Sequence, residues 1–144
     1  MEPSVGSDPR QVWRQRAARA AVALVLIANL SASVPYLIAP GTYAAAFELE
    51  GAAGAAMVRA IGVLFLMWCV AYVPVVARPD RHPALFGVIL VQQVVGLAGE
   101  SWILASLPAG HVALWATGLR FIAFDGAGLA LLGLAFVLTW RRSG

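Results

Sequence analysis

Four long apolar runs constrain the fold of this chain more than any other feature. They cover residues 17–39, 55–77, 84–107 and 112–140. Each run exceeds the roughly 20 residues that a helix needs to cross about 30 Å of hydrocarbon. Backbone polar groups find no water in a bilayer, so each run is predicted to be helical, and the period-two alternation of a membrane barrel is missing. The sequence therefore predicts an all-α, integral membrane four-helix bundle.

Composition excludes the main alternatives to a membrane protein. Hydrophobic residues make up 61% of the 144 residues and charged residues only 12%, against about 45–50% and about 25% in soluble domains. Such a chain has too little charge for a soluble globule and too many apolar residues for a disordered segment. A single cysteine, Cys69, excludes an internal disulfide framework. We predict one transmembrane domain over residues 12–142, preceded by a disordered cytoplasmic tail over residues 1–11.

The arginines outside the apolar runs predict the orientation. All ten basic residues are arginine. Eight of them lie outside the runs or, in the case of Arg19, at the very start of the first run: Arg10, Arg14, Arg16, Arg19, Arg78, Arg81, Arg141 and Arg142. These eight fall in the N-terminal tail, the second connection and the C-terminus, whereas the first connection carries Glu48 and Glu50 and no basic residue. The positive-inside rule then puts both termini in the cytoplasm. Arginine-only basicity and heavy alanine use are typical of a GC-rich bacterial genome, so we expect a bacterial plasma (inner) membrane.

Two segments near the first run allow alternative interpretations. A basic start, an apolar stretch over residues 20–30 and small residues at 31–33 are compatible with a cleaved signal peptide, but the apolar run continues to Ile38, which favours a full span. In the first connection, Tyr43 and Phe47 lie among helix formers. We expect a short helix on the outer interface with both rings in the headgroups; the alternative is a lid over the bundle.

Four ionisable residues fall inside the predicted spans, namely Arg59, Glu100, Arg120 and Asp125. Each costs about 2.5–3.5 kcal/mol at a helix centre, so each needs a partner or water. At 1.5 Å per residue, Arg59, Glu100 and Arg120 lie within roughly 12 Å of the outer surface and Asp125 lies deeper. We therefore expect Glu100 to pair with Arg59, Arg120 or both. Asp125 is five residues from Arg120 on one helix, so the two side chains do not face each other, and the partner of Asp125 must come from a different helix.

Polar and small residues share helix faces with these charges. On the third run Gln93 and Glu100 lie on one stripe, with Gln92 beside it. Small residues that would let the helices approach closely are Gly62, Gly96, Gly99, Gly126 and Gly128. The cluster is either a structural ion-pair network or a polar pocket that opens outward and binds a ligand or moves a proton. The candidate site residues are Arg59, Gln92, Gln93, Glu100, Arg120 and Asp125.

Other chemistry-bearing residues give weaker signals. His82 and His111 lie in turns on opposite sides of the membrane, and we interpret both as solvated loop residues. No nucleotide-binding loop, metal motif or nucleophile elbow is present in the sequence. We therefore predict no cofactor and no metal, and we expect a non-enzymatic protein.

The entry to the second run resembles a known group of proteins. Residues Pro40, Tyr43 and Phe47-Glu48-Leu49-Glu50-Gly51 lead into Arg59, Gly62 and Leu64-Phe65-Leu66. This pattern, with the chain length and helix count, resembles the small bacterial four-helix membrane proteins that include the DoxX-like and BphX-like families. The resemblance implies a four-helix bundle rather than a reaction. Some members of that group are accessory subunits of respiratory or sulfur-oxidising membrane complexes.

Three functions are compatible with these features. The leading hypothesis is a non-enzymatic accessory or small-ligand-binding bundle. The second is a small proton-coupled transporter, which would act as a dimer because four helices are too few for a transport path. The third is a redox partner that binds quinone or haem near Trp68, Trp102 and the two glutamines. Expected partners are the lipid bilayer and a second copy or a larger membrane complex, and no nucleic acid.

Overall fold

The computed structural model of the chain describes residues 9–140, apart from the side chain of Trp140. The described elements, in chain order, are α1 (Pro9–Ile38), α2 (Pro40–Ala44), η1 (Ala45–Phe47), α3 (Gly51–Cys69), α4 (Tyr72–Ala77), η2 (Pro79–Arg81), α5 (Pro83–Ser106) and α6 (Val112–Trp140). Over this part of the chain there is no strand, which confirms the all-α prediction. Four helices, α1, α3, α5 and α6, are long and apolar enough to cross a membrane. The protein is a small multi-pass membrane protein.

The helix ends differ from the predicted limits in two places. α1 begins at Pro9, so residues 9–11 are helical rather than part of the expected tail. Proline is tolerated in the first turn of a helix, and the arginine, glutamine and alanine residues that follow favour helix. The rest of the expected tail, residues 1–8, lies outside the described residues, as do Arg141 and Arg142.

The second predicted span, residues 55–77, is divided between α3 and α4. Val70 and Ala71 separate the two helices but keep right-handed helical angles, with φ −57° and ψ −41° at Val70. Pro74 explains the break, because it has no N–H to donate to the Val70 carbonyl and its ring crowds that carbonyl. α3 and α4 together therefore form one span with an interrupted hydrogen-bond ladder.

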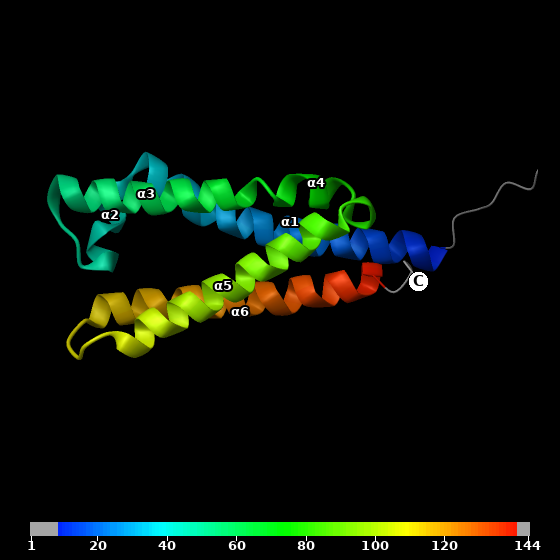
Figure 1. The fold of residues 1–144 in the computed structure, drawn as a ribbon. Helices are drawn as coiled ribbons and strands as arrows, with labels where there is room; N and C mark the ends of the chain where they lie inside the picture. Colours follow the sequence, from blue (N-terminus) through cyan, green and yellow to red (C-terminus); the bar gives the residue numbers. More distant parts are fainter. Residues whose placement is uncertain (1–8, 141–144) are drawn as a thin grey trace, which may run out of the picture.

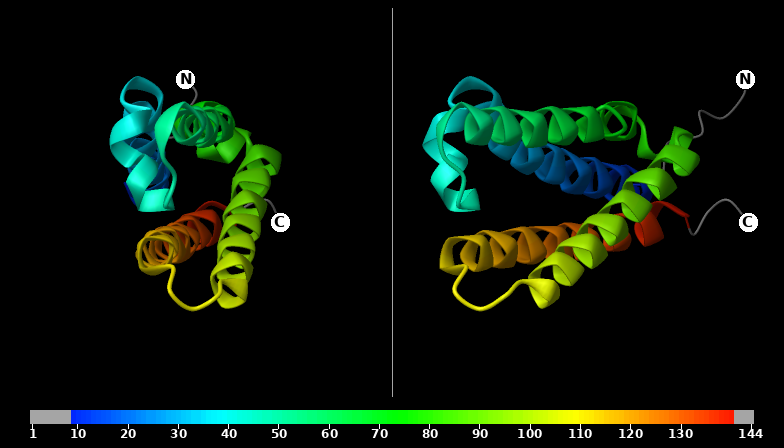
Figure 2. Two further views of the ribbon diagram at one scale, coloured as in Figure 1. Left: turned by 90° about the vertical axis from the view of Figure 1, so that its left-hand side faces the viewer. Right: turned by 60° about the vertical axis from the view of Figure 1, so that its left-hand side comes forward.

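The four long helices stand at the corners of a bundle with one incompletely closed side. α1 packs against both α3 and α6, and α5 packs against α6. Viewed along the bundle, the order around the axis is α1, α3, α5, α6 (Figure 2, left). α3 itself makes little contact with α5, and this side is closed mainly where α4 meets α5. Away from α4, the two helices diverge (Figure 1).

The two ends of the bundle carry opposite charge. The start of α1, the α4–η2 connection and the end of α6 lie together on the right in Figure 1, and Arg14, Arg19 and Arg81 belong to this basic end. The opposite, acidic end holds α2, η1 and the α5–α6 turn, with Glu48 and Glu50 in the connection that leads into α3. The chain therefore brings together the basic segments that the sequence predicted to lie on one side.

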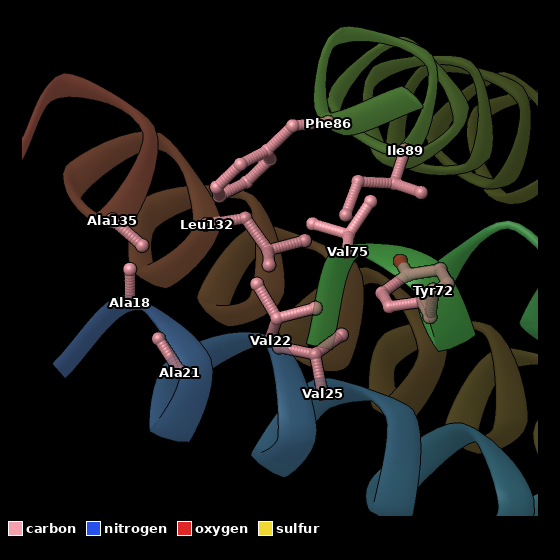
Figure 3. Packing of buried hydrophobic residues seen from close by; sticks show 10 residues of the cluster. All are labelled: Ala18, Ala21, Val22, Val25, Tyr72, Val75, Phe86, Ile89, Leu132 and Ala135. Carbon is pink, nitrogen blue, oxygen red and sulfur yellow. The ribbon is translucent and has the colours of Figure 1, made fainter. Parts of the chain in front are cut away.

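The basic half of the bundle has a dense apolar core. Four chain segments contribute to it, and its residues are Ala18, Ala21, Val22, Val25, Tyr72, Val75, Phe86, Ile89, Leu132 and Ala135 (Figure 3). The rings of Phe86 and Phe136 meet edge to face at 5.2 Å. Arg19 closes this half, because its Nε donates to the carbonyl of Val76 at 3.1 Å. This half of the bundle is closed by side-chain packing.

Candidate functional site

A cavity of about 290 Å³ lies inside the bundle between the apolar core and the acidic end. Residues of α1, α3, α5 and α6 line it, so all four long helices form its wall. Its polar lining residues are Asn29, Ser31, Gln93, Glu100, Arg120 and Asp125. The cavity thus gathers most of the ionisable and amide side chains of the spans in one place.

Buried polar groups mark the boundary between the cavity and the core. The hydroxyl of Tyr72 donates to Oε1 of Gln93 at 3.3 Å, and Nε2 of Gln93 donates to the backbone carbonyl of Asp125 at 3.4 Å. Tyr72 is fully buried and Gln93 is 2% exposed. Next to them, Nδ2 of Asn29 donates to the carbonyl of Val25 at 3.1 Å. The bonds of Gln93 link α4, α5 and α6 at one depth. Each pairs a polar group that would be costly to leave unpaired inside the bundle.

Two glycines provide the space for this polar layer. A side chain at Gly96 of α5 would overlap the carboxylate of Asp125, and one at Gly128 of α6 would overlap the amide of Gln93. Gly62 has a similar role between α3 and α1, where Tyr36 and Ser33 lie against it. Gly99 and Gly126, which the sequence grouped with them, face open space. Close approach therefore explains three of the five glycines.

The charged side chains do not form the predicted ion pairs. In the described part of the chain, no ion pair joins Glu100 to Arg59 or to Arg120. Arg59 lies outside the cavity lining, and its Nε donates to the carbonyl of Leu37 at 3.4 Å, near the end of α1. The last carbonyls of a helix have no partner in that helix, so Leu37 offers an acceptor that the prediction overlooked.

The other predicted site residues also lie in different surroundings. Arg120 lines the cavity and donates through Nη2 to the hydroxyl of Thr117 at 3.0 Å. Glu100 lines the cavity too, and its Oε2 is buried with no hydrogen-bond partner among residues 9–140. Gln92 faces a separate outer groove of about 520 Å³ between α5 and Trp68. Four of the six predicted residues therefore share the cavity, and Arg59 and Gln92 do not.

Aromatic rings form much of the remaining cavity wall. They are Phe65, Trp68, Phe121 and Phe124. Phe65 and Phe121 meet edge to face at 5.8 Å. The sequence analysis named Trp68 only for the redox hypothesis and did not select the three phenylalanines, although Phe121 precedes Asp125 by four residues and so shares its face of the helix. That spacing was the available signal, and it indicates a mixed aromatic and acidic face on α6.

The first connection folds over the acidic end, and its aromatic rings pack against rings of the long helices. Tyr43 packs against Tyr36 at 5.0 Å between ring centroids, and Phe47 packs against Tyr36 at 5.8 Å and Phe121 at 6.2 Å. These contacts favour the alternative of a lid over the bundle, because Tyr43 and Phe47 find aromatic partners within the protein. Through Phe121 the connection touches a ring that lines the cavity.

Glu48 attaches this connection to the start of α6. Its carboxylate accepts from Nδ1 of His111 at 2.6 Å and from the backbone N–H groups of Ala113 and Leu114 at 3.1 and 3.3 Å. The hydrogen bond from His111, followed by the bonds from the α6 amides, lowers the pKa of Glu48. Negative charge is favourable at a helix N-terminus. His111, predicted to be a solvated loop residue, is thus one of the partners of Glu48.

Neither chemistry nor similarity assigns a known activity to this site. Between residues 9 and 140, no three His, Cys, Asp or Glu side chains converge to hold a metal ion. No family model, curated protein or solved structure matches the chain.

Proposed function

We propose that the protein is a non-enzymatic, small-ligand-binding protein of the bacterial plasma membrane, and that the cavity is its ligand site. The observation that carries the proposal is the cavity itself, which combines about 290 Å³ of space with aromatic walls and several polar side chains. Ligand sites are concave, largely apolar and equipped with a few polar groups that fix orientation. A purely structural ion-pair network would instead bring its charges into contact.

The packing of the basic half favours binding over transport. Between the cavity and the basic end, Val22, Ile89 and Leu132 are fully buried in the apolar core. The apolar core therefore separates the cavity from the basic end of the described chain. The redox hypothesis has less support, because Trp102 is 77% exposed and is not among the cavity-lining residues. We retain the accessory role that the DoxX-like and BphX-like resemblance implies, with a second copy or a larger membrane complex as partner.

We further propose that the acidic end faces outward and that both termini are cytoplasmic. The positive-inside rule supports this orientation, since the basic end gathers the arginines. Cysteine placed at exposed Glu50, in a Cys69→Ser background, should react with an impermeant thiol reagent on right-side-out vesicles. Cysteine at exposed Arg78 should react only after the vesicles are inverted, and the reverse pattern would overturn the orientation.

Alkylation of a cavity cysteine tests the ligand site directly. Ala32→Cys lies in the cavity wall, whereas Ala21→Cys lies in the apolar core on the same helix, three turns away. In a Cys69→Ser background, N-ethylmaleimide should modify Ala32→Cys in the folded protein and leave Ala21→Cys unmodified. Both variants should react after denaturation in detergent. Failure of Ala32→Cys to react before denaturation would contradict a ligand-accessible cavity.

A further inference from the structure

The charges in the cavity are unbalanced. Glu100 and Asp125 bring two carboxylates, whereas Arg120 is the one arginine of residues 9–140 that lines the cavity. Arg59 would have balanced the set, but its Nε is bound to the Leu37 carbonyl instead. With all three groups ionised, the lining carries one net negative charge. The cavity therefore lacks one positive charge. An unneutralised carboxylate inside a membrane costs free energy, so a cation bound there would stabilise the site.

Across residues 9–140, Arg120 forms no ion pair with either carboxylate. Its guanidinium is held by Thr117, whose own hydroxyl donates to the carbonyl of Ala46 in η1 at 2.7 Å. Asp125 lies five residues further along α6, about 7.5 Å towards the basic end. The carboxylate of Asp125 lies against Gly96, and Oε2 of Glu100 has no partner in the described chain. The deeper part of the cavity therefore has acceptors without a cation.

The walls around these acceptors suit an organic cation better than a metal ion. Phe65, Trp68, Phe121 and Phe124 line the cavity, and the faces of such rings attract an alkylammonium group. A divalent metal prefers several oxygen ligands, and no cluster of three His, Cys, Asp or Glu side chains is found across residues 9–140. The volume of about 290 Å³ lies at the small end of ligand pockets.

We infer that the cavity binds a small organic cation, with its charged nitrogen between Asp125 and Glu100 and its apolar part against the aromatic wall. This inference rests on the proposed ligand-binding function and names its ligand class. The ligand supplies the missing positive charge of the cavity. Arg120, nearer the acidic end, lies beyond the cation and excludes a second one.

Protection of Ala32→Cys from N-ethylmaleimide tests the ligand class in the full-length protein in nanodiscs. The probe is benzyltrimethylammonium, and the matched control is benzylsulfonate, which has the same ring and the opposite charge. We expect saturating benzyltrimethylammonium to slow alkylation by at least about tenfold, because an occupied cavity excludes the reagent, and benzylsulfonate to have no effect. Protection by benzylsulfonate alone, or by neither compound, would overturn the inference.

Substitutions identify the groups that hold the cation. Glu100→Gln and Asp125→Asn should each raise the benzyltrimethylammonium concentration needed for half protection by about tenfold, because each removes a charge-assisted contact. Arg59→Gln should leave it unchanged, since Arg59 is not part of the lining. If Asp125→Asn fails to fold, Glu100→Gln and Glu100→Asp carry the test, and unchanged protection in Glu100→Gln would contradict the assignment.

Alkylation without any probe reports on the proposed function separately. If Ala32→Cys fails to react, the proposed ligand site is wrong. Normal alkylation without protection by the cation removes only the ligand class.

Discussion

The two halves of the bundle are built from the same helices and differ sharply in character. On α1, Val22 and Val25 of the apolar half are followed one turn later by Asn29. On α5, Ile89 is followed one turn later by Gln93. The change occurs at a similar depth on two helices that lie diagonally across the bundle, and both helices line the cavity beyond this point. A filled core thus gives way to a hollow site that combines polar side chains with aromatic rings. A continuous helix can therefore supply stability at one end and a binding site at the other.

The sharpest test of this comparison is the apolar half, where we expect the largest effect. Leu132 is fully buried, whereas Leu134, two residues later on α6, is 62% exposed. Leu132→Ala should lower the free energy of unfolding by about 2–5 kcal/mol, because it leaves a cavity in a packed core. Leu134→Ala should change it by less than about 0.5 kcal/mol. Denaturant-induced unfolding in mixed micelles measures both, and equal effects would show that the basic half is loosely packed.

The glycines of α5 give a second matched pair, at the level of the polar layer. Gly96→Ala places a methyl group against the Asp125 carboxylate, whereas Gly99 faces open space. We expect Gly96→Ala to destabilise the protein by about 1–2 kcal/mol through overpacking. Gly99→Ala should be neutral or slightly stabilising, because alanine favours helix over glycine. The same unfolding assay distinguishes them, and a harmless Gly96→Ala would show that the Asp125 side chain moves aside without cost.

Glu100 in the cavity should behave in the opposite way to the core residues, because removing its charge should stabilise the fold. A buried carboxylate without a partner costs free energy in a membrane, and Oε2 of Glu100 has none in the described chain. Glu100→Gln in the ligand-free protein should raise the free energy of unfolding by about 1 kcal/mol. Exposed Glu50→Gln is the control and should have little effect. Destabilisation by Glu100→Gln would support the ion-pair network that the sequence first indicated.

The fold could be predicted from the sequence, and the site only in part, for a physical reason. The length of an apolar run and the distribution of arginines are properties of the chain alone, and they predict four spans and the grouping of the basic segments. A site depends on helix rotation as well as depth. Gln92 and Gln93 have nearly the same depth but lie about 100° apart on α5, and only Gln93 lines the cavity. Depth also suggested a role for Arg59, but it could not show that the end of α1 offers an acceptor at Leu37.

Contacts between distant segments were beyond sequence reasoning. Glu48 and His111 are 63 residues apart, and neither has a local pattern that indicates a pair. Their contact turns the first connection from an interfacial anchor into a cover whose aromatic rings contact the bundle. This cover belongs to the acidic half, and it is the region where we expect the smallest effect of substitution.

The final prediction concerns the pH dependence of this cover. The pKa of Glu48 is lowered below its ordinary value of 4.5 by its bond to His111, so its ionised form is favoured by folding. The contribution of Glu48 is therefore fully present above pH 4.5 and is lost as the pH falls through the lowered pKa. Hydrogen exchange at the amides of Ala113 and Leu114 measures this, since both donate to Glu48. Their protection, relative to other α6 amides, should fall on acidification.

Glu48→Gln should lower the same protection already at neutral pH and remove its acid dependence, because a neutral amide holds these N–H groups more weakly. Glu50→Gln should leave both unchanged, and protection that ignores pH in the wild-type protein would show that Glu48 does not hold the cover in place.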